Sequence, residues 1–206
     1  MSKLSLNHPI VEQSFAIIDR EVGEHNLSSQ EYAIARRVIH ATADFEYLKL
    51  LQFSPGAIAA GIISLQQGIP IVTDVSMVKQ GIKSLVTKTF NNPIITAIDQ
   101  AETAMPGKTR TETGLLRCWE KYSEAVYVIG NAPTALMALC EQVSNSEVKP
   151  ALVIGVPVGF VSVIESKQAL AKLDIPQILI QGRKGGSPAA ASILNALLIL
   201  ALENNY

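Results

Sequence analysis

Cysteine, aromatic residues and net charge are all scarce in this chain of 206 residues. The two cysteines, Cys118 and Cys140, share no C-x-x-C spacing, which argues against a metal ribbon or a disulfide framework and favours reduced thiols. The net charge is −1, so no overall electric field favours nucleic acid or a membrane surface. We therefore expect neither nucleic acid nor a membrane as a partner.

Long hydrophobic runs are also missing. The most apolar stretch, residues 190–202, is interrupted by Ser192 and Asn195 and is too short to cross a bilayer. The first ten residues, MSKLSLNHPI, lack the apolar core of a secretory signal. These features predict a cytoplasmic protein.

Short apolar runs of buried-strand length recur through the last two thirds of the sequence. They are PIVTDV (70–75), PIITAID (93–99), AVYVIG (125–130), ALVIGV (151–156) and QILIQG (177–182). Helical patterns lie between them, at about 76–84, 110–122, 132–143, 162–172 and 188–203. Alternating strands and helices predict an α/β protein with a doubly wound, parallel, five-stranded sheet of the flavodoxin-like type, although the strand order stays open.

The first third of the chain has helical character instead. Val11, Phe15, Ile18 and Val22 recur at helical spacing, and Ser28-x-x-Glu31 is a capping-box pattern for a second helix. A third helix is expected from about residue 54 to residue 68. We predict one domain over residues 1–206, with these helices as an N-terminal extension.

Glycine, asparagine and proline gather after the third, fourth and fifth predicted strands, in GNAPT (130–134), GVPVGF (155–160) and QGRKGGS (181–187). In open parallel sheets, ligands bind beyond the carboxyl ends of the strands, where glycine permits close approach and helix N-termini offer N–H groups to anions. These segments lack the lysine-Ser/Thr order of a P-loop, and no G-x-G-x-x-G follows a strand. We expect a large ligand with several acidic groups, bound through backbone amides of the three loops.

Basic residues are placed to support such a ligand. Arg110, Arg117 and Lys121 share one helix face, and Arg183 and Lys184 lie in the last loop. Each alone would commonly be a solvated surface charge, but the planar fork of arginine suits carboxylates.

His40 stands in the helical stretch RRVIHATADFE (36–46). A lone helical histidine is more often a packed or surface residue than a catalytic one, so its position alone assigns no role. Histidine can, however, give or take a proton near neutral pH. Asp44 and Glu46 are interpreted as solvated or structural carboxylates, with orientation of His40 as the alternative.

Five separated motifs appear in order along the chain: RRVIHATADFE, TDVSMVKQGI (73–82), YVIGNAPTAL (127–136), PALVIGVPVGFVSVIESK (150–167) and GRKGGSPAAASILNAL (182–197). Together they resemble the precorrin-8X methylmutases, also called precorrin isomerases. The resemblance extends from SFAIID (14–19) to the last predicted helix.

This resemblance implies a flavodoxin-like homodimer with its pocket near the subunit interface and with no cofactor. It implies an isomerase of cobalamin biosynthesis that moves a methyl group from carbon 11 to carbon 12 of precorrin-8X or cobalt-precorrin-8, giving hydrogenobyrinic or cobyrinic acid. His40 matches the family's catalytic histidine, Ser14 a pocket serine and Arg110 an arginine near the reacting ring. The other expected substrate-binding residues are Arg117, Asn131, Arg183, Lys184 and Ser187.

Three alternatives remain at this point. A non-catalytic corrinoid-binding protein would share the scaffold, and turnover would distinguish it. A receiver domain requires an aspartate at the end of the third strand, where this chain has Gly130-Asn131. A flavin-binding relative is disfavoured because 5% of residues are aromatic and no aromatic pair follows the strands. The sequence leaves open whether the substrate carries cobalt and whether Arg110 or Arg117 faces the ring.

Overall fold

The structure is a computed structural model and describes residues 8–204. Its six strands are β1 (Leu51–Phe53), β2 (Ile71–Thr73), β3 (Ile94–Thr96), β4 (Val126–Ile129), β5 (Leu152–Gly155) and β6 (Gln177–Ile180). Its α-helices within the described residues are α1 (Pro9–Val22), α2 (Ser29–Thr42), α3 (Tyr47–Leu50), α4 (Ala57–Gln66), α5 (Ser76–Lys88), α6 (Arg110–Tyr122), α7 (Pro133–Ser144), α8 (Val163–Ala171) and α9 (Ser187–Glu203). A short 3-10 helix, η1 (Ala97–Gln100), follows β3.

The strands form one mixed sheet in the order β1-β6-β5-β4-β2-β3. The five predicted strands all form and all run parallel, which confirms the α/β class. The prediction of a sheet with five strands needs correction, because β1 adds a sixth strand that pairs antiparallel with β6. This three-residue segment, LQF, is too short to show a strand period in the sequence. Pairing with β6 makes it a strand, so a tertiary contact decides its conformation.

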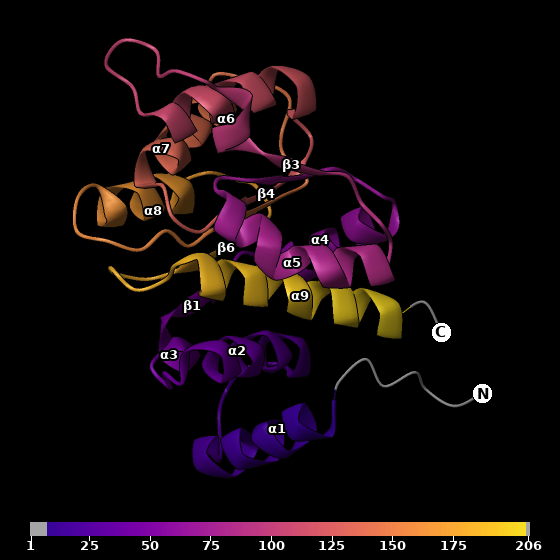
Figure 1. The fold of residues 1–206 in the computed structure, drawn as a ribbon. Coiled ribbons are helices and arrows are strands. Elements are labelled where there is room, and N and C mark those ends of the chain that lie inside the picture. Colours follow the sequence, from indigo (N-terminus) through magenta and orange to yellow (C-terminus); the bar gives the residue numbers. More distant parts are fainter. Residues whose placement is uncertain (1–7, 205–206) are drawn as a thin grey trace.

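Helices cover both faces of the sheet, with α6, α7 and α8 on one face and α4, α5 and α9 on the other (Figure 1). The alternation of buried side chains along β4 shows the two layers directly. Val126 and Val128 pack with the α9 side, whereas Tyr127 and Ile129 pack with the α7 side. Strands buried on both faces read as continuous apolar runs, which is why the sequence revealed them.

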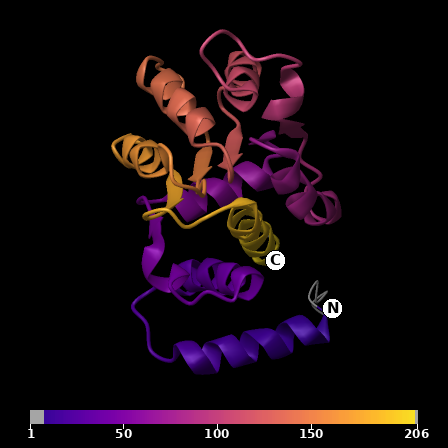
Figure 2. The same ribbon diagram turned by 60° about the vertical axis from the view of Figure 1, so that its left-hand side comes forward.

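Helices α1 and α2 form an outer layer beyond α9, whereas α4, which was expected in the same N-terminal extension, packs against β5 and α9 (Figures 1 and 2). Helix α9 is therefore enclosed between the sheet and α2, and its apolar residues face both neighbours. The capping box of Ser28 and Glu31 begins α2 as predicted. The helix ends at Thr42, and its C-cap Ala43 has a left-handed φ of 53°, so the chain turns sharply just after the last turn, which carries His40.

Candidate active site

Three strand-exit loops meet at the carboxyl edge of the sheet, as the sequence predicted. The amide of Gly186 donates to the carbonyl of Val156 at 2.9 Å, and the amide of Gly159 donates to the carbonyl of Arg183 at 3.3 Å. The third loop joins them at Gly130, where an added Cβ would lie 3.0 Å from the Cα of Ser187. Asn131, Arg183 and Ser187 therefore lie on loops that contact one another.

Gly185 is required where these loops cross. Its φ is +145°, a conformation that residues with a side chain rarely adopt, and an added Cβ would lie 2.2 Å from the carbonyl oxygen of Val156. The 155–160 and 182–187 loops can pack this closely only because the side chain is missing.

The end of the His40 helix is attached to the same loops. The Lys184 ammonium lies 2.6 Å from a carboxylate oxygen of Asp44 and 3.0 Å from one of Glu46. The Tyr47 hydroxyl donates to the carbonyl of Gly185 at 3.3 Å. The hydrogen bond from Lys184 lowers the pKa of Asp44 despite the opposing effect of desolvation. Asp44 and Glu46 are thus structural carboxylates that fix the 182–187 loop beside α2.

His40 itself is exposed in the last turn of α2. Its ring meets the ring of Phe15 edge-on, with centroids 5.4 Å apart and an interplanar angle of 76°. Phe15 is buried, so the contact supports one side of the imidazole while the residue keeps access to solvent. An accessible histidine on a packed support can act on a bound molecule.

Ser14 and the arginines before His40 belong to the contact between α1 and α2. The Ser14 hydroxyl donates to the carbonyl of Ile10 at 2.9 Å. Arg36 pairs with Asp19 at 2.9 Å and lies 4.4 Å from the centroid of the Phe15 ring. These contacts hold α1 against α2 and leave Ser14 adjacent in sequence to the residue that supports His40.

The two candidate arginines of α6 have different surroundings. The Arg117 guanidinium donates to the carbonyl of Gln100 at 2.6 Å, so it is occupied in fixing η1. Arg110 is exposed at the first position of α6, next to Thr109, whose hydroxyl lies 3.0 Å from that of Thr134. Arg110 therefore lies beside the 130–134 loop at the sheet edge.

Asp74 is a site-edge residue to which the sequence assigned no role. It directly follows β2 and is fully buried. Its carboxylate accepts the amides of Asn131 at 2.6 Å, Ala132 at 2.8 Å and Val75 at 2.9 Å. Burial raises its pKa, against the opposing effect of these backbone N–H groups. The sequence feature that could have indicated Asp74 is the polar pair Thr73-Asp74 at the end of the apolar run 70–75.

The position of Asp74 corrects one expectation about the loops. The chain order of the parallel strands reverses between β2 and β4, and crevices at such switch points are common ligand sites. Here the amides of Asn131 and Ala132 already donate to Asp74, so they are engaged within the protein. The expected capture of a ligand carboxylate by these two amides is therefore unsupported.

The 182–187 loop has the opposite character. Four consecutive carbonyls accept hydrogen bonds from within the protein: Gly182 and Lys184 from Lys167, Arg183 from the amide of Gly159, and Gly185 from Tyr47. With these acceptors satisfied and Lys184 paired with Asp44 and Glu46, the loop can offer the Arg183 guanidinium to an anion.

Apolar side chains stand exposed next to this loop. Phe160 is 84% exposed and Val161 is 81% exposed, at the turn that leads into α8. The Arg183 guanidinium lies 5.7 Å from the centroid of the Phe160 ring. An exposed aromatic surface beside a cation suits a flat ring that carries carboxylates.

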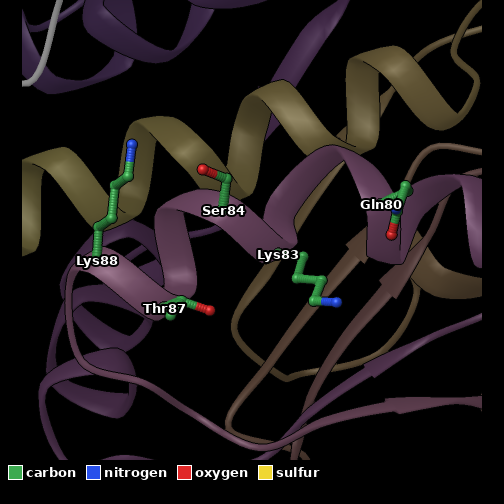
Figure 3. A pocket seen from close by; sticks show the side chains of 5 residues that line it. All are labelled: Gln80, Lys83, Ser84, Thr87 and Lys88. Carbon is green, nitrogen blue, oxygen red and sulfur yellow. The ribbon is translucent and has the colours of Figure 1, made fainter.

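Two open hollows lie elsewhere on the described surface. One, of about 620 Å³, is lined by residues 23–26. The other, of about 330 Å³, lies along α5 between Gln80 and Lys88 (Figure 3). Neither hollow is lined by a residue that the sequence predicts for the site, so the candidate site remains the group of predicted residues at the sheet edge. Within residues 8–204, no helix combines the length and the apolar character needed to span a bilayer.

Comparisons with known proteins agree with the motifs. The family model described as CbiC, precorrin-8X methylmutase, matches residues 9–200. The cobalt-precorrin-8 methylmutase of Synechocystis sp. is 61% identical over 96% of this chain and 98% of its own length. The precorrin-8X methylmutase of Pseudomonas aeruginosa is 39% identical over 91% of this chain and 93% of its own length.

A solved structure supports the same assignment. The crystal structure of precorrin-8x methyl mutase from Thermus thermophilus superimposes with a TM-score of 0.87 and 40% identity, covering 97% of this chain and 100% of the other. The predicted activity class, an isomerase of cobalamin biosynthesis, is confirmed by these matches. The chain belongs to the precorrin-8X methylmutase family.

Proposed function

We propose that this chain moves a methyl group from carbon 11 to carbon 12 of a bound corrinoid, with His40 as the catalytic acid–base. The observation that carries the proposal is the position of His40. It is accessible at the end of α2, and Lys184 with Asp44 joins this end of the helix to the 182–187 loop. The proposed substrate is cobalt-precorrin-8, the compound in the name of the relative that is 61% identical, with precorrin-8X as the alternative.

The reaction is a rearrangement within one molecule, so it requires no external nucleophile or hydride. The protein must hold one conformer of the ring and assist a proton or tautomer change in the conjugated system. A positioned acid or base typically contributes roughly 10²–10⁴-fold to such a step. The remaining acceleration comes from fixing the ring and stabilising developing charge.

We propose that the substrate carboxylates bind at the 182–187 loop, whose carbonyls are engaged within the protein, and not at the amides of the 130–134 loop, which donate to Asp74. Arg183 would pair with a peripheral carboxylate, and the exposed Phe160 would contact the ring face. Ser187, buried at the start of α9, would border the site. Between the two α6 arginines we propose Arg110, because Arg117 already donates to Gln100. The backbone N–H of Asn131 donates to Asp74, so we propose that Asn131 contacts the substrate through its side chain.

Lys184 and Ser14 take indirect parts in this proposal. The Lys184 ammonium contacts two carboxylates, so it would place the loop beside α2 rather than bind a substrate carboxylate. Ser14 would border the pocket through its place on α1 next to Phe15.

The wider setting is part of the proposal. We propose a single domain with a flavodoxin-like core, since the parallel strands follow the order β3-β2-β4-β5-β6, which corresponds to the 2-1-3-4-5 order of such sheets. A cytoplasmic homodimer with its pocket near the subunit interface is also proposed. The exposed Ile10 and Ile17 of α1 supply apolar surface for a second copy.

The test is a His40→Ala variant assayed by the absorption change of cobalt-precorrin-8 and of precorrin-8X. We expect turnover to fall by about 10²–10⁴-fold while binding of the product corrinoid stays within about threefold. Since His40 is exposed, the variant should keep its thermal unfolding midpoint. Turnover at the wild-type rate in a folded, corrinoid-binding variant would remove His40 from the mechanism, and a wild-type protein that binds the corrinoid but does not convert it would be a carrier.

A further inference from the structure

Lys167 has no part in the proposed chemistry, yet it is a buried cation next to the site. It lies in the middle of α8, and 3% of its surface is exposed. Its ammonium donates to the carbonyl of Gly182 at 2.9 Å and to the carbonyl of Lys184 at 2.6 Å. Desolvation lowers its pKa to about 8. Among residues 8–204, no carboxylate forms an ion pair with it.

A buried cation without an anionic partner disfavours folding, and an apolar side chain of similar length would avoid that cost. The two carbonyls that Lys167 binds flank Arg183, the residue proposed to meet a substrate carboxylate. In return for that cost, the two hydrogen bonds of Lys167 hold the backbone of the 182–187 loop in place.

The loop needs such a restraint. Gly182, Gly185 and Gly186 all have positive φ, at 71°, 145° and 110°, and glycine is the residue that loses most conformational freedom on folding. Lys167 supplies two of the four hydrogen bonds that engage the carbonyls of residues 182–185. It thereby turns acceptors inward, where they cannot repel an approaching anion.

We propose that Lys167 is a positioning residue, which binds the carbonyls on both sides of Arg183 and so fixes the 182–187 loop for a carboxylate-bearing substrate. The inference rests on the proposed function of this loop. Lys167 acts through the loop and makes no contact with the reacting carbons.

The experiment compares the wild-type protein with Lys167→Met, which keeps an unbranched side chain one atom shorter but loses the donors. Lys172→Met, an exposed position at the end of the same helix, is the matched control. Two quantities are measured: the dissociation constant for hydrogenobyrinic or cobyrinic acid, and hydrogen–deuterium exchange of the 182–187 amides in the free protein.

We expect Lys167→Met to raise the dissociation constant about tenfold and to accelerate exchange in the 182–187 segment, with exchange in β4 and β5 unchanged. KM should rise more than kcat falls, because the loop binds the periphery of the ring. Lys167→Arg, which keeps a charged donor, should restore part of the affinity. Lys172→Met should match the wild type in both measurements.

Both changes must appear together. Unchanged exchange, with or without a loss of affinity, would overturn the inference, because the loop would then be fixed without Lys167. Faster exchange with unchanged affinity would also overturn it, since the loop would not serve the ligand. If Lys167→Met does not fold, Lys167→Gln, which loses the charge and one donor, is judged by the same two criteria. Failure of the wild-type protein to bind either corrinoid would instead overturn the proposed function, and this is visible before any variant is made.

Discussion

Two buried charges fix loops at the same sheet edge with opposite chemistry. Asp74 accepts backbone N–H groups of the 130–134 turn, whereas Lys167 donates to backbone carbonyls of the 182–187 loop. The first loop has its donors engaged inward, and the second has its acceptors engaged inward. Two strand-exit loops at the same edge of the sheet therefore differ in what they offer to an anion.

From this difference we expect a ligand to bind away from the switch point of the sheet. Asp74 occupies the place near the start of α7 that an anionic ligand would take in other doubly wound proteins. The carboxylate arms of a corrinoid are thereby expected on the side of Arg183, near the end of the His40 helix. Variants at Asp74 test the 130–134 loop, and variants at Gly185 and Lys184 test the 182–187 loop.

The largest effect is expected from removing the carboxylate of Asp74. Asp74→Ala leaves the amides of Val75, Asn131 and Ala132 buried without their acceptor, at about 1–3 kcal/mol each before relaxation. We expect the free energy of unfolding in urea to fall by about 3 kcal/mol or more. Asp74→Asn keeps one acceptor oxygen but sets an N–H₂ donor against backbone N–H groups at the other position, so it should lose less than Asp74→Ala but more than about 1 kcal/mol. A loss below about 1 kcal/mol in Asp74→Ala would show that Asp74 is not the anchor of this turn.

The next largest effect is expected at the crossing of the two other loops. Gly185→Ala places a Cβ against the carbonyl of Val156 and must displace the 182–187 loop. Since a misplacement of about 1 Å can cost about 10²-fold, kcat/KM should fall by about that factor. Gly182→Ala is the matched control, because its φ of 71° is also positive but its Cβ would meet open space. Equal losses in both variants would show that backbone strain, and not the contact between loops, controls activity.

The smallest effect is expected from the ion pair between Lys184 and Asp44, which is partly exposed. If Lys184 only positions the loop, Lys184→Met and Asp44→Asn should each weaken corrinoid binding about threefold, and the double variant should be no weaker than either. Additive losses, measured by titration of the three variants, would instead place Lys184 on the substrate.

The pH dependence of this pair has a defined sign. Lys184 holds the pKa of Asp44 below its ordinary value of 3.8, so the carboxylate's contribution to stability is fully present above that pH. It should be lost as the pH falls through the lower native value, and Asp44→Asn should lack this part of the acid dependence. The comparison uses urea unfolding between pH 5 and the acid transition.

Local patterns in the sequence were sufficient for the five parallel strands and for the start of α2. The parallel strands were readable because they are buried on both faces, and the capping box marked the start of α2 because the cap lies within four residues. The loops after β4, β5 and β6 could be placed at one edge because parallel strands end on the same side. The order of five separated motifs was sufficient to indicate the family, which the comparisons confirm.

Long-range contacts decided the rest. Strand β1 exists because β6 pairs with it, and the roles of Lys167, Lys184 and Asp74 depend on partners 15, 140 and 57 positions away. A sequence shows that a residue can donate, accept or carry charge. Only the folded chain decides which groups are already satisfied inside the protein, because burial brings distant polar groups together and leaves the remaining ones for a ligand.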